Sequence, residues 1–145
     1  MQSPRRFARR AALAAAAASL PFCSSVARAG AVEEPVESAD LNDTVQVQAN
    51  LFCGVHISAS RYENRIVVIT EVNDTKGDCL IPVATFITAS YTTAAGDTQR
   101  TSVTSESYRA TLQVEGSFSD LGQTTHSIYW RNAGTVWEET LTPSK

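Results

Sequence analysis

The sequence predicts an all-β protein in which seven to eight short strands form an antiparallel sandwich. Three observations predict this class. Apolar and polar residues alternate with a period of two over most of the chain after residue 44. Turn-forming residues recur between the alternating stretches. No stretch has the apolar period of a helix over a useful length, and residues 30–145 are long enough for one domain with a closed core.

Residues 1–29 have the features of a bacterial export signal. Four arginines precede an alanine-rich apolar stretch at residues 11–20, and Ala27-Arg28-Ala29 is a small-x-small cleavage site. A membrane anchor needs about 20 strongly apolar residues, and this stretch is shorter and mostly alanine. We therefore expect cleavage near Gly30, no membrane span, and a periplasmic or extracellular protein. Paired arginines leave the general and the twin-arginine export routes both open.

Cleavage also determines which cysteines remain. A lipid-anchor cysteine follows a small residue, whereas Cys23 follows the bulky Phe22, so we expect Cys23 to leave with the signal. Cys53 and Cys79 then form the single possible pair, and an oxidising compartment favours a disulfide. The bond closes a loop of about 26 residues and contributes about 3–4 kcal/mol in the chain-entropy model. Two separate buried thiols are the alternative.

The charge of the secreted part is strongly negative. Five of the 12 basic residues lie in residues 1–29 and none of the 15 acids does, so residues 30–145 carry a net charge of about −8. A nucleic-acid-binding protein needs a basic stripe, and binding to an anionic membrane needs clustered lysine and arginine. Neither is present, and we expect no nucleic-acid partner.

The strands are expected in the following order. Residues 30–43 are acidic, contain a proline and have no apolar period, so they are predicted to be a flexible N-terminal segment preceding a sandwich domain at 44–145. Alternation predicts strands at 45–49 and 51–59, and residues 65–72 are apolar on both faces, as in a central strand. Further strands are predicted at 83–93, 98–105, 108–114, 126–131 and 135–141. The connecting turns are predicted at 73–78, 94–97, 116–122 (a loop) and 132–134, where a glycine is placed for positive φ.

The cysteine pair predicts that these strands are divided between two sheets. In a flat meander, strands 51–59 and 79–91 would lie about 9–10 Å apart across the middle strand. Bridged cysteines need Cα atoms within about 7 Å. One strand is therefore expected to cross to the opposing sheet, as in an immunoglobulin-like (Ig-like) sandwich. The likeness is one of architecture, because both tryptophans follow the second cysteine and the Cys–Trp–Cys pattern is absent.

No catalytic or metal signature is present. His56 and His126 lie in strand patterns without further ligands at metal spacing, so both are expected at the surface and no metal or cofactor is expected. The nucleophile motif Gly-x-Ser-x-Gly is absent. Asp120, His126 and the serines of 116–122 are close in sequence, but a chain this rich in serine and threonine offers such sets by chance.

The strongest candidate for binding is the hairpin at 127–139. Ile128 and Trp130 are expected on one face of the strand, with Tyr129 and Arg131 on the other. One of the two tryptophans is expected in the core, which leaves Tyr129, Arg131 and Trp137 as the predicted binding set for a sugar ring or a protein.

These observations favour a secreted, non-catalytic binding or interaction module with a protein or glycan partner. A secreted inhibitor or effector that acts on another protein is the first alternative, and a small extracellular hydrolase is the second. The sequence contains no signal for the oligomeric state.

Overall fold

The computed structural model describes residues 31–48, 50–73, 83–130 and 134–145. A compact unit, Val32–Lys145, contains eight strands, and no helix lies among the described residues. The strands are β1 (Glu37–Gln48), β2 (Leu51–Arg61), β3 (Arg65–Asn73), β4 (Val83–Thr93), β5 (Thr98–Ser105), β6 (Arg109–Glu115), β7 (Phe118–Trp130) and β8 (Gly134–Leu141).

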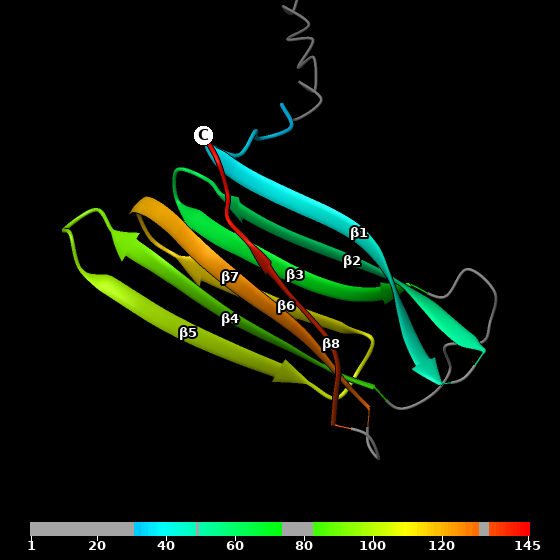
Figure 1. Cartoon of the computed structure of the whole chain (residues 1–145). Helices are drawn as coiled ribbons and strands as arrows, with labels where there is room; N and C mark the ends of the chain where they lie inside the picture. The colour runs from blue at the N-terminus through cyan, green and yellow to red at the C-terminus, as the bar shows by residue number, and fades with distance from the viewer. Residues whose placement is uncertain (1–30, 49, 74–82, 131–133) are drawn as a thin grey trace, which may run out of the picture. The chain divides into compact units, whose positions relative to one another are not determined.

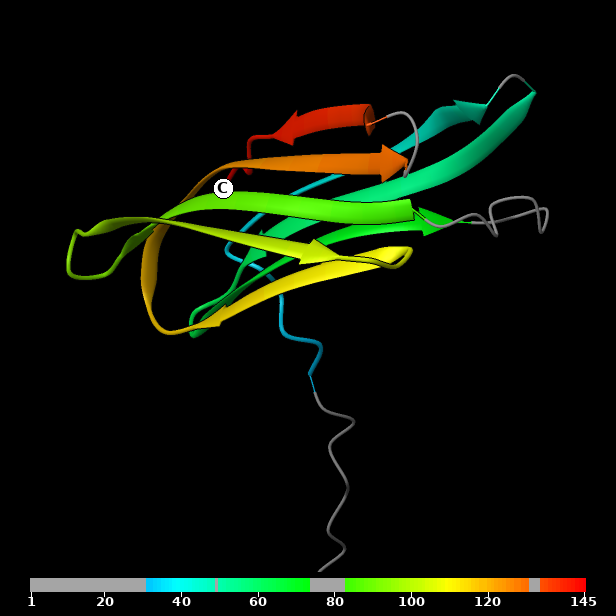
Figure 2. The same ribbon diagram turned by 90° about the horizontal axis from the view of Figure 1, so that it is seen from below.

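The strands form two four-stranded sheets, which Figures 1 and 2 show as two layers. Sheet A has the order β1-β2-β3-β6 and sheet B the order β5-β4-β7-β8. Every neighbouring pair is antiparallel. The predicted all-β class and the two antiparallel sheets are therefore confirmed.

The chain changes from sheet A to sheet B between β3 and β4, as a bond between Cys53 and Cys79 would require. β2 and β3 are neighbours in sheet A, and β4 lies in sheet B. A strand has thus left the flat meander, as predicted. Cys53 is buried on β2, whereas Cys79 lies outside the described residues, so the bond between them stays a prediction.

The core forms where the inward-facing side chains of the two sheets meet. β3 shows strict alternation, with Ile66, Val68, Thr70 and Val72 buried and the residues between them half-buried. Partial burial of the outer residues agrees with the predicted central strand, because β3 lies between β2 and β6. The other large, fully buried aliphatic side chains come from both sheets: Val55, Ile57, Ile87, Leu112, Leu121 and Ile128.

β1 begins at Glu37, whereas the sequence placed the start of the sandwich at residue 44. Ala39 and Leu41 pack against the core, and Val45 is buried. The inward alternation therefore extends into the segment that was expected to be flexible. It was not evident in the sequence because the inward positions include the acidic Glu37 and Asp43, and their partners Leu121 and Trp137 lie far along the chain.

β7 begins at Phe118, inside the stretch that was predicted to be a loop. The ring of Phe118 meets Tyr91 edge to face, with centroids 5.3 Å apart, and Leu121 is buried. Gly122 belongs to the predicted loop, but in the structure it lets the backbones of β7 and β4 approach each other closely. A Cβ on Gly122 would lie 3.2 Å from the carbonyl oxygen of Ser90, where the β4–β7 register shifts.

The turns follow the predicted chemistry where the structure describes them. Gly96 has φ 95° in the turn between β4 and β5, and Gly134 has φ 73° at the start of β8. Most of the turn predicted at 73–78 lies outside the described residues. Within the described part of the chain, no helix is long and apolar enough to cross a membrane.

Candidate functional site

Tyr129 is the predicted binding residue that the structure leaves most accessible among those it describes. It lies near the end of β7, on the outer face of sheet B, and 39% of its surface is exposed. Phe86 of β4 lies beside it on the same face, with ring centroids 6.4 Å apart and planes at 87°. We call these two residues the Phe86–Tyr129 patch. Edge-to-face packing holds the tyrosine ring in place without covering it.

Hydroxyl groups surround this patch. Thr88 and Ser102 join β4 to β5 through a 3.0 Å hydrogen bond, and Ser127 donates to Glu138 at 2.9 Å. Thr104 lies directly opposite Phe86 in the β4–β5 register. The outer face of sheet B therefore combines an aromatic pair with side chains that donate and accept hydrogen bonds.

Trp137 does not belong to this face. It lies opposite Ile128 in the β7–β8 register, so it shares the inward face of sheet B and packs against the core. Its indole Nε1 donates to the carboxylate of Asp43 on β1 at 2.9 Å. This hydrogen bond and the one from the Thr44 amide hold the pKa of Asp43 below its usual value.

The predicted set of Tyr129, Arg131 and Trp137 is thus not assembled in one place. Tyr129 and Trp137 lie on opposite faces of sheet B, and Arg131 is outside the described residues. The register shift between Ile128 and Tyr129 changes the pairing along the hairpin, which the sequence did not reveal.

Trp130 is the buried tryptophan, with 7% of its surface exposed. Phe86 was missed, although its position between the buried Thr85 and Ile87 already placed it on the outer face.

His126 is in the core, which corrects the expected surface position. Its Nδ1 lies 2.8 Å from the Thr70 hydroxyl on sheet A, and its Nε2 lies 2.8 Å from the Thr124 hydroxyl. Its surface is fully buried, and burial lowers its pKa to about 4. A neutral imidazole has one donor and one acceptor nitrogen, so two hydroxyls satisfy it completely. The half-buried His56 lies on the outer face of sheet A instead.

The residues considered for catalysis are also apart. Asp120 lies opposite Thr92 and is exposed, whereas His126 is inside the core. The Ser119 hydroxyl donates to the carbonyls of Thr92 and Thr93, at 3.4 and 3.1 Å. Neither histidine nitrogen can reach a substrate, because both already contact threonine hydroxyls.

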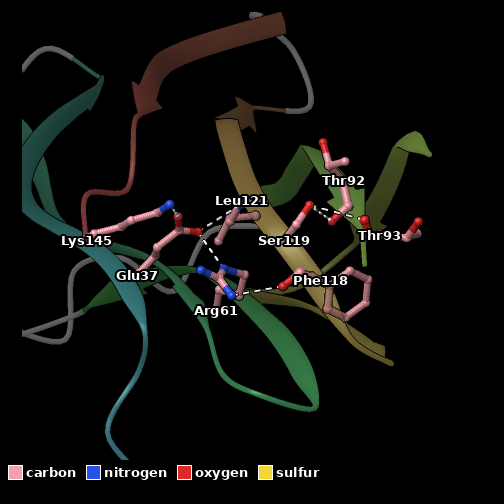
Figure 3. A network of polar contacts seen from close by, with 8 residues as sticks. All are labelled: Glu37, Arg61, Thr92, Thr93, Phe118, Ser119, Leu121 and Lys145. Carbon is pink, nitrogen blue, oxygen red and sulfur yellow. Dashed lines mark hydrogen bonds and ion pairs between the residues drawn. The ribbon is translucent and has the colours of Figure 1, made fainter. Parts of the chain in front are cut away.

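A buried ion pair joins the two sheets near the C-terminal residue Lys145 (Figure 3). Arg61 Nε of β2 lies 2.6 Å from Glu37 Oε2 of β1, and both side chains are buried. The same carboxylate oxygen accepts the Leu121 amide of β7 at 2.9 Å, and Arg61 Nη1 donates to the Phe118 carbonyl at 2.9 Å. Lys145 Nζ is 3.9 Å from Glu37 Oε1.

Two opposing effects act on the Glu37 carboxyl. Burial raises its pKa, but hydrogen bonds from Arg61 and the Leu121 amide, with the charges of Arg61 and Lys145, outweigh this and hold the pKa below its usual value. Glu37 is therefore a buried anion whose partners come from three separate segments. Its carboxylate links β1 to β2, to β7 and to the C-terminal Lys145 (Figure 3).

The described residues contain no group of three or more His, Cys, Asp or Glu side chains that could hold a metal ion. Searches against protein-family models, curated proteins and solved structures found no match to this chain. The geometry of the described residues is therefore the basis for a functional proposal.

Proposed function

We propose that this protein is a secreted, non-catalytic binding module and that the Phe86–Tyr129 patch contacts its protein or glycan partner. The single observation that carries the proposal is the exposed Tyr129, braced by Phe86 on a face rich in hydroxyls. Exposed tyrosines supply large contact areas with little loss of conformational freedom and are common at binding hot spots. Stacking on a sugar ring uses the same flat aromatic surface.

The proposal includes export and cleavage near Gly30. The compact unit begins at Val32, two residues after the predicted cleavage point, so removal of the preceding residues leaves all eight strands in the chain. We also propose a disulfide between Cys53 and Cys79. The burial of Cys53 and the change of sheets between β3 and β4 support it.

We further propose that the sandwich is Ig-like. In immunoglobulin domains, strands B and E are neighbours in one sheet, and C, F and G follow one another in the other. β3 and β6 are neighbours in sheet A, while β4, β7 and β8 follow in that order in sheet B. β5 then takes the place of strand C′ and β2 that of strand A, with β1 as an additional edge strand.

The experiment compares the unsubstituted protein, Tyr129→Ala and Phe52→Ala. Binding is measured on a glycan array and in pull-downs from the extracellular medium of the source organism. The Tyr129→Ala variant is expected to lose at least tenfold in affinity for any partner found, as truncation of a hot-spot tyrosine does. Phe52→Ala is the matched control, because Phe52 is 57% exposed but lies in sheet A. It is expected to bind as the unsubstituted protein does.

Two results would contradict the proposal. One is a partner that binds Tyr129→Ala and the unsubstituted protein equally well, which would place the contact elsewhere. The other is the absence of any partner in both assays.

A further inference from the structure

The four edge strands differ in how they are protected against pairing with another chain. A sheet edge presents unpaired backbone N–H and C=O groups and will accept a further strand unless bulges, charges or covering segments prevent it. The edges here are β1 and β6 of sheet A and β5 and β8 of sheet B.

The edge of β1 is covered and irregular. The backbone of Ser144 near the C-terminus bonds to that of Ser38 in both directions, at 3.2 and 3.4 Å. Figure 1 shows the end of the chain beside the start of β1. The register with β2 shifts between Gln46 and Gln48. Asp40 adds an exposed charge in the first half of the strand.

The edge of β8 is interrupted as well. Val136 is an extra residue between the pairs that Thr135 and Trp137 make with β7. Trp137 reaches across to Asp43 of β1, which ties this edge to the edge of the other sheet. Glu138 and Glu139 are exposed charges on the same strand.

β6 is the shortest strand and carries charge at both ends. Arg109 lies 3.9 Å from Glu71, and Glu115 accepts a hydrogen bond from Gln113. Seven residues with exposed ionic side chains at each end form an unfavourable template for a further strand.

Among the described residues, β5 is the least protected of the four edges. Its eight residues pair with β4 from Thr98 to Ser105 without a register shift, and Arg100 is its only charged residue. It contains no proline, lysine or acid, and threonine and valine favour strands. Among the residues that the structure describes, no backbone hydrogen bond outside the β4 ladder reaches it. Every second residue therefore turns its backbone N–H and C=O away from β4.

We propose that β5 pairs with β5 of a second copy of this chain, antiparallel and about a two-fold axis, to form a continuous eight-stranded sheet. The sequence of β5 is complementary to itself. With Ser102 on the axis, Arg100 faces Thr104 of the second copy and Thr101 faces Val103, so no like charges oppose each other and the pairs suit a sheet. A two-fold dimer is also the commonest oligomer.

The dimer would place both binding surfaces on one side. The axis is perpendicular to the sheet, so the outer faces of the two copies point the same way. The two β7 strands are five strand spacings apart, about 24 Å. Resting on the proposed function, this arrangement presents two Phe86–Tyr129 patches to one multivalent partner and raises its avidity.

The test is sedimentation equilibrium of the protein in the form that its host exports. The protein concentration is varied from about 10 μM to about 1 mM. The unsubstituted protein is expected to approach twice the monomer mass as concentration rises. Ser102→Lys places two ammonium groups opposite each other at the axis and is expected to stay monomeric. Thr111→Lys puts the same charge midway along β6 and is expected to dimerise normally.

A monomer at every concentration in the unsubstituted protein overturns the proposal, and so does a dimer that persists in Ser102→Lys. If circular dichroism shows that Ser102→Lys is unfolded, hydrogen exchange of the unsubstituted protein decides. Backbone amides of 98–105 must become more protected as concentration rises, and no change contradicts the pairing. Binding tests separate the two proposals, because a monomeric Ser102→Lys that still binds through Tyr129 keeps the binding function.

Discussion

Buried polar side chains join the two sheets of this sandwich. Glu37 and Arg61 bring β1 and β2 against β7, and the Thr70–His126 hydrogen bond crosses the core from β3 to β7. Among the described residues, no buried side-chain nitrogen or oxygen lacks a partner. Such contacts are costly to break singly, because removal of one partner leaves the other buried and unsatisfied.

Glu37→Ala is expected to lower the free energy of unfolding by about 3–5 kcal/mol, because it leaves the buried Arg61 without its counterion. Glu33→Ala is the matched control. It removes a glutamate that also lies 2.7 Å from an arginine, Arg65, but both of these side chains are partly exposed. An exposed pair contributes about 0–1 kcal/mol. Urea unfolding of the three proteins at pH 7 measures the difference, and equal losses would show that burial does not govern the Glu37 contact.

His126 is expected to make the protein less stable as the pH falls from 7 to 5. Its folded pKa of about 4 lies below the ordinary value of 6.5, so the unfolded chain binds a proton in this range and the folded chain does not. Stability is therefore complete above pH 6.5 and is lost as the pH falls towards 4. The loss between pH 7 and pH 5 is about 2 kcal/mol.

Urea unfolding of the unsubstituted protein and of His126→Gln across this range tests the assignment. Glutamine cannot take up the proton, so the variant is expected to show a flatter dependence between pH 7 and pH 5. Glu37 contributes below its ordinary pKa of 4.5, because its folded pKa is lower still, and therefore outside this window. Parallel pH curves would exclude His126 as the source.

At the scale of the element, β3 shows most directly how alternation determines packing. It is an interior strand of sheet A with a buried inward face. Its consecutive residues Val67 and Val68 are the same amino acid and differ only in the face of the sheet to which they point. Two of the four edge strands are less regular. β1 and β8 include register shifts, and contacts with distant segments determine where β1 begins.

Val68→Ala is expected to cost about 2–3 kcal/mol of unfolding free energy, since it removes two fully buried methyl groups and leaves a cavity. Val67→Ala is chemically identical, but Val67 lies on the half-buried outer face, where the cost is expected to be below about 1 kcal/mol. Thermal and urea unfolding give both values. A larger loss for Val67 would mean that the assigned faces of β3 are exchanged.

At the scale of the whole molecule, the proposed disulfide adds a covalent link to the change of sheets after β3. Reduction is expected to lower the free energy of unfolding by about 3–4 kcal/mol, because the unfolded chain regains the freedom of a loop of about 26 residues. Unfolding with and without a thiol reductant measures this.

A mass spectrum of the exported protein should show a chain that begins at Gly30 and lies two hydrogens below the reduced mass. A retained Cys23, or stability unaffected by reductant, would contradict the pairing.

Much of the architecture was predictable from local pattern. Alternation over residues 51–59 and 65–72 identified β2 and β3, and Gly134 at the start of β8 has the expected positive φ. The candidate site was predictable only in part. Tyr129 was identified because it alternates with two buried neighbours, whereas its neighbour Phe86 comes from a strand more than 40 residues earlier.

The sequence by itself determined the strand class and the approximate strand positions, because these follow from local periodicity. The division of strands between two sheets was expected from a cysteine bond that itself stays a prediction. Only the tertiary structure decided that Glu37 begins a strand, that His126 is buried, and that Tyr129 and Trp137 face opposite ways. Each of these depends on a partner from a distant segment: the Leu121 amide for Glu37, Thr70 for His126 and Asp43 for Trp137. Periodicity carries no information about such partners, since the same alternation suits any of them.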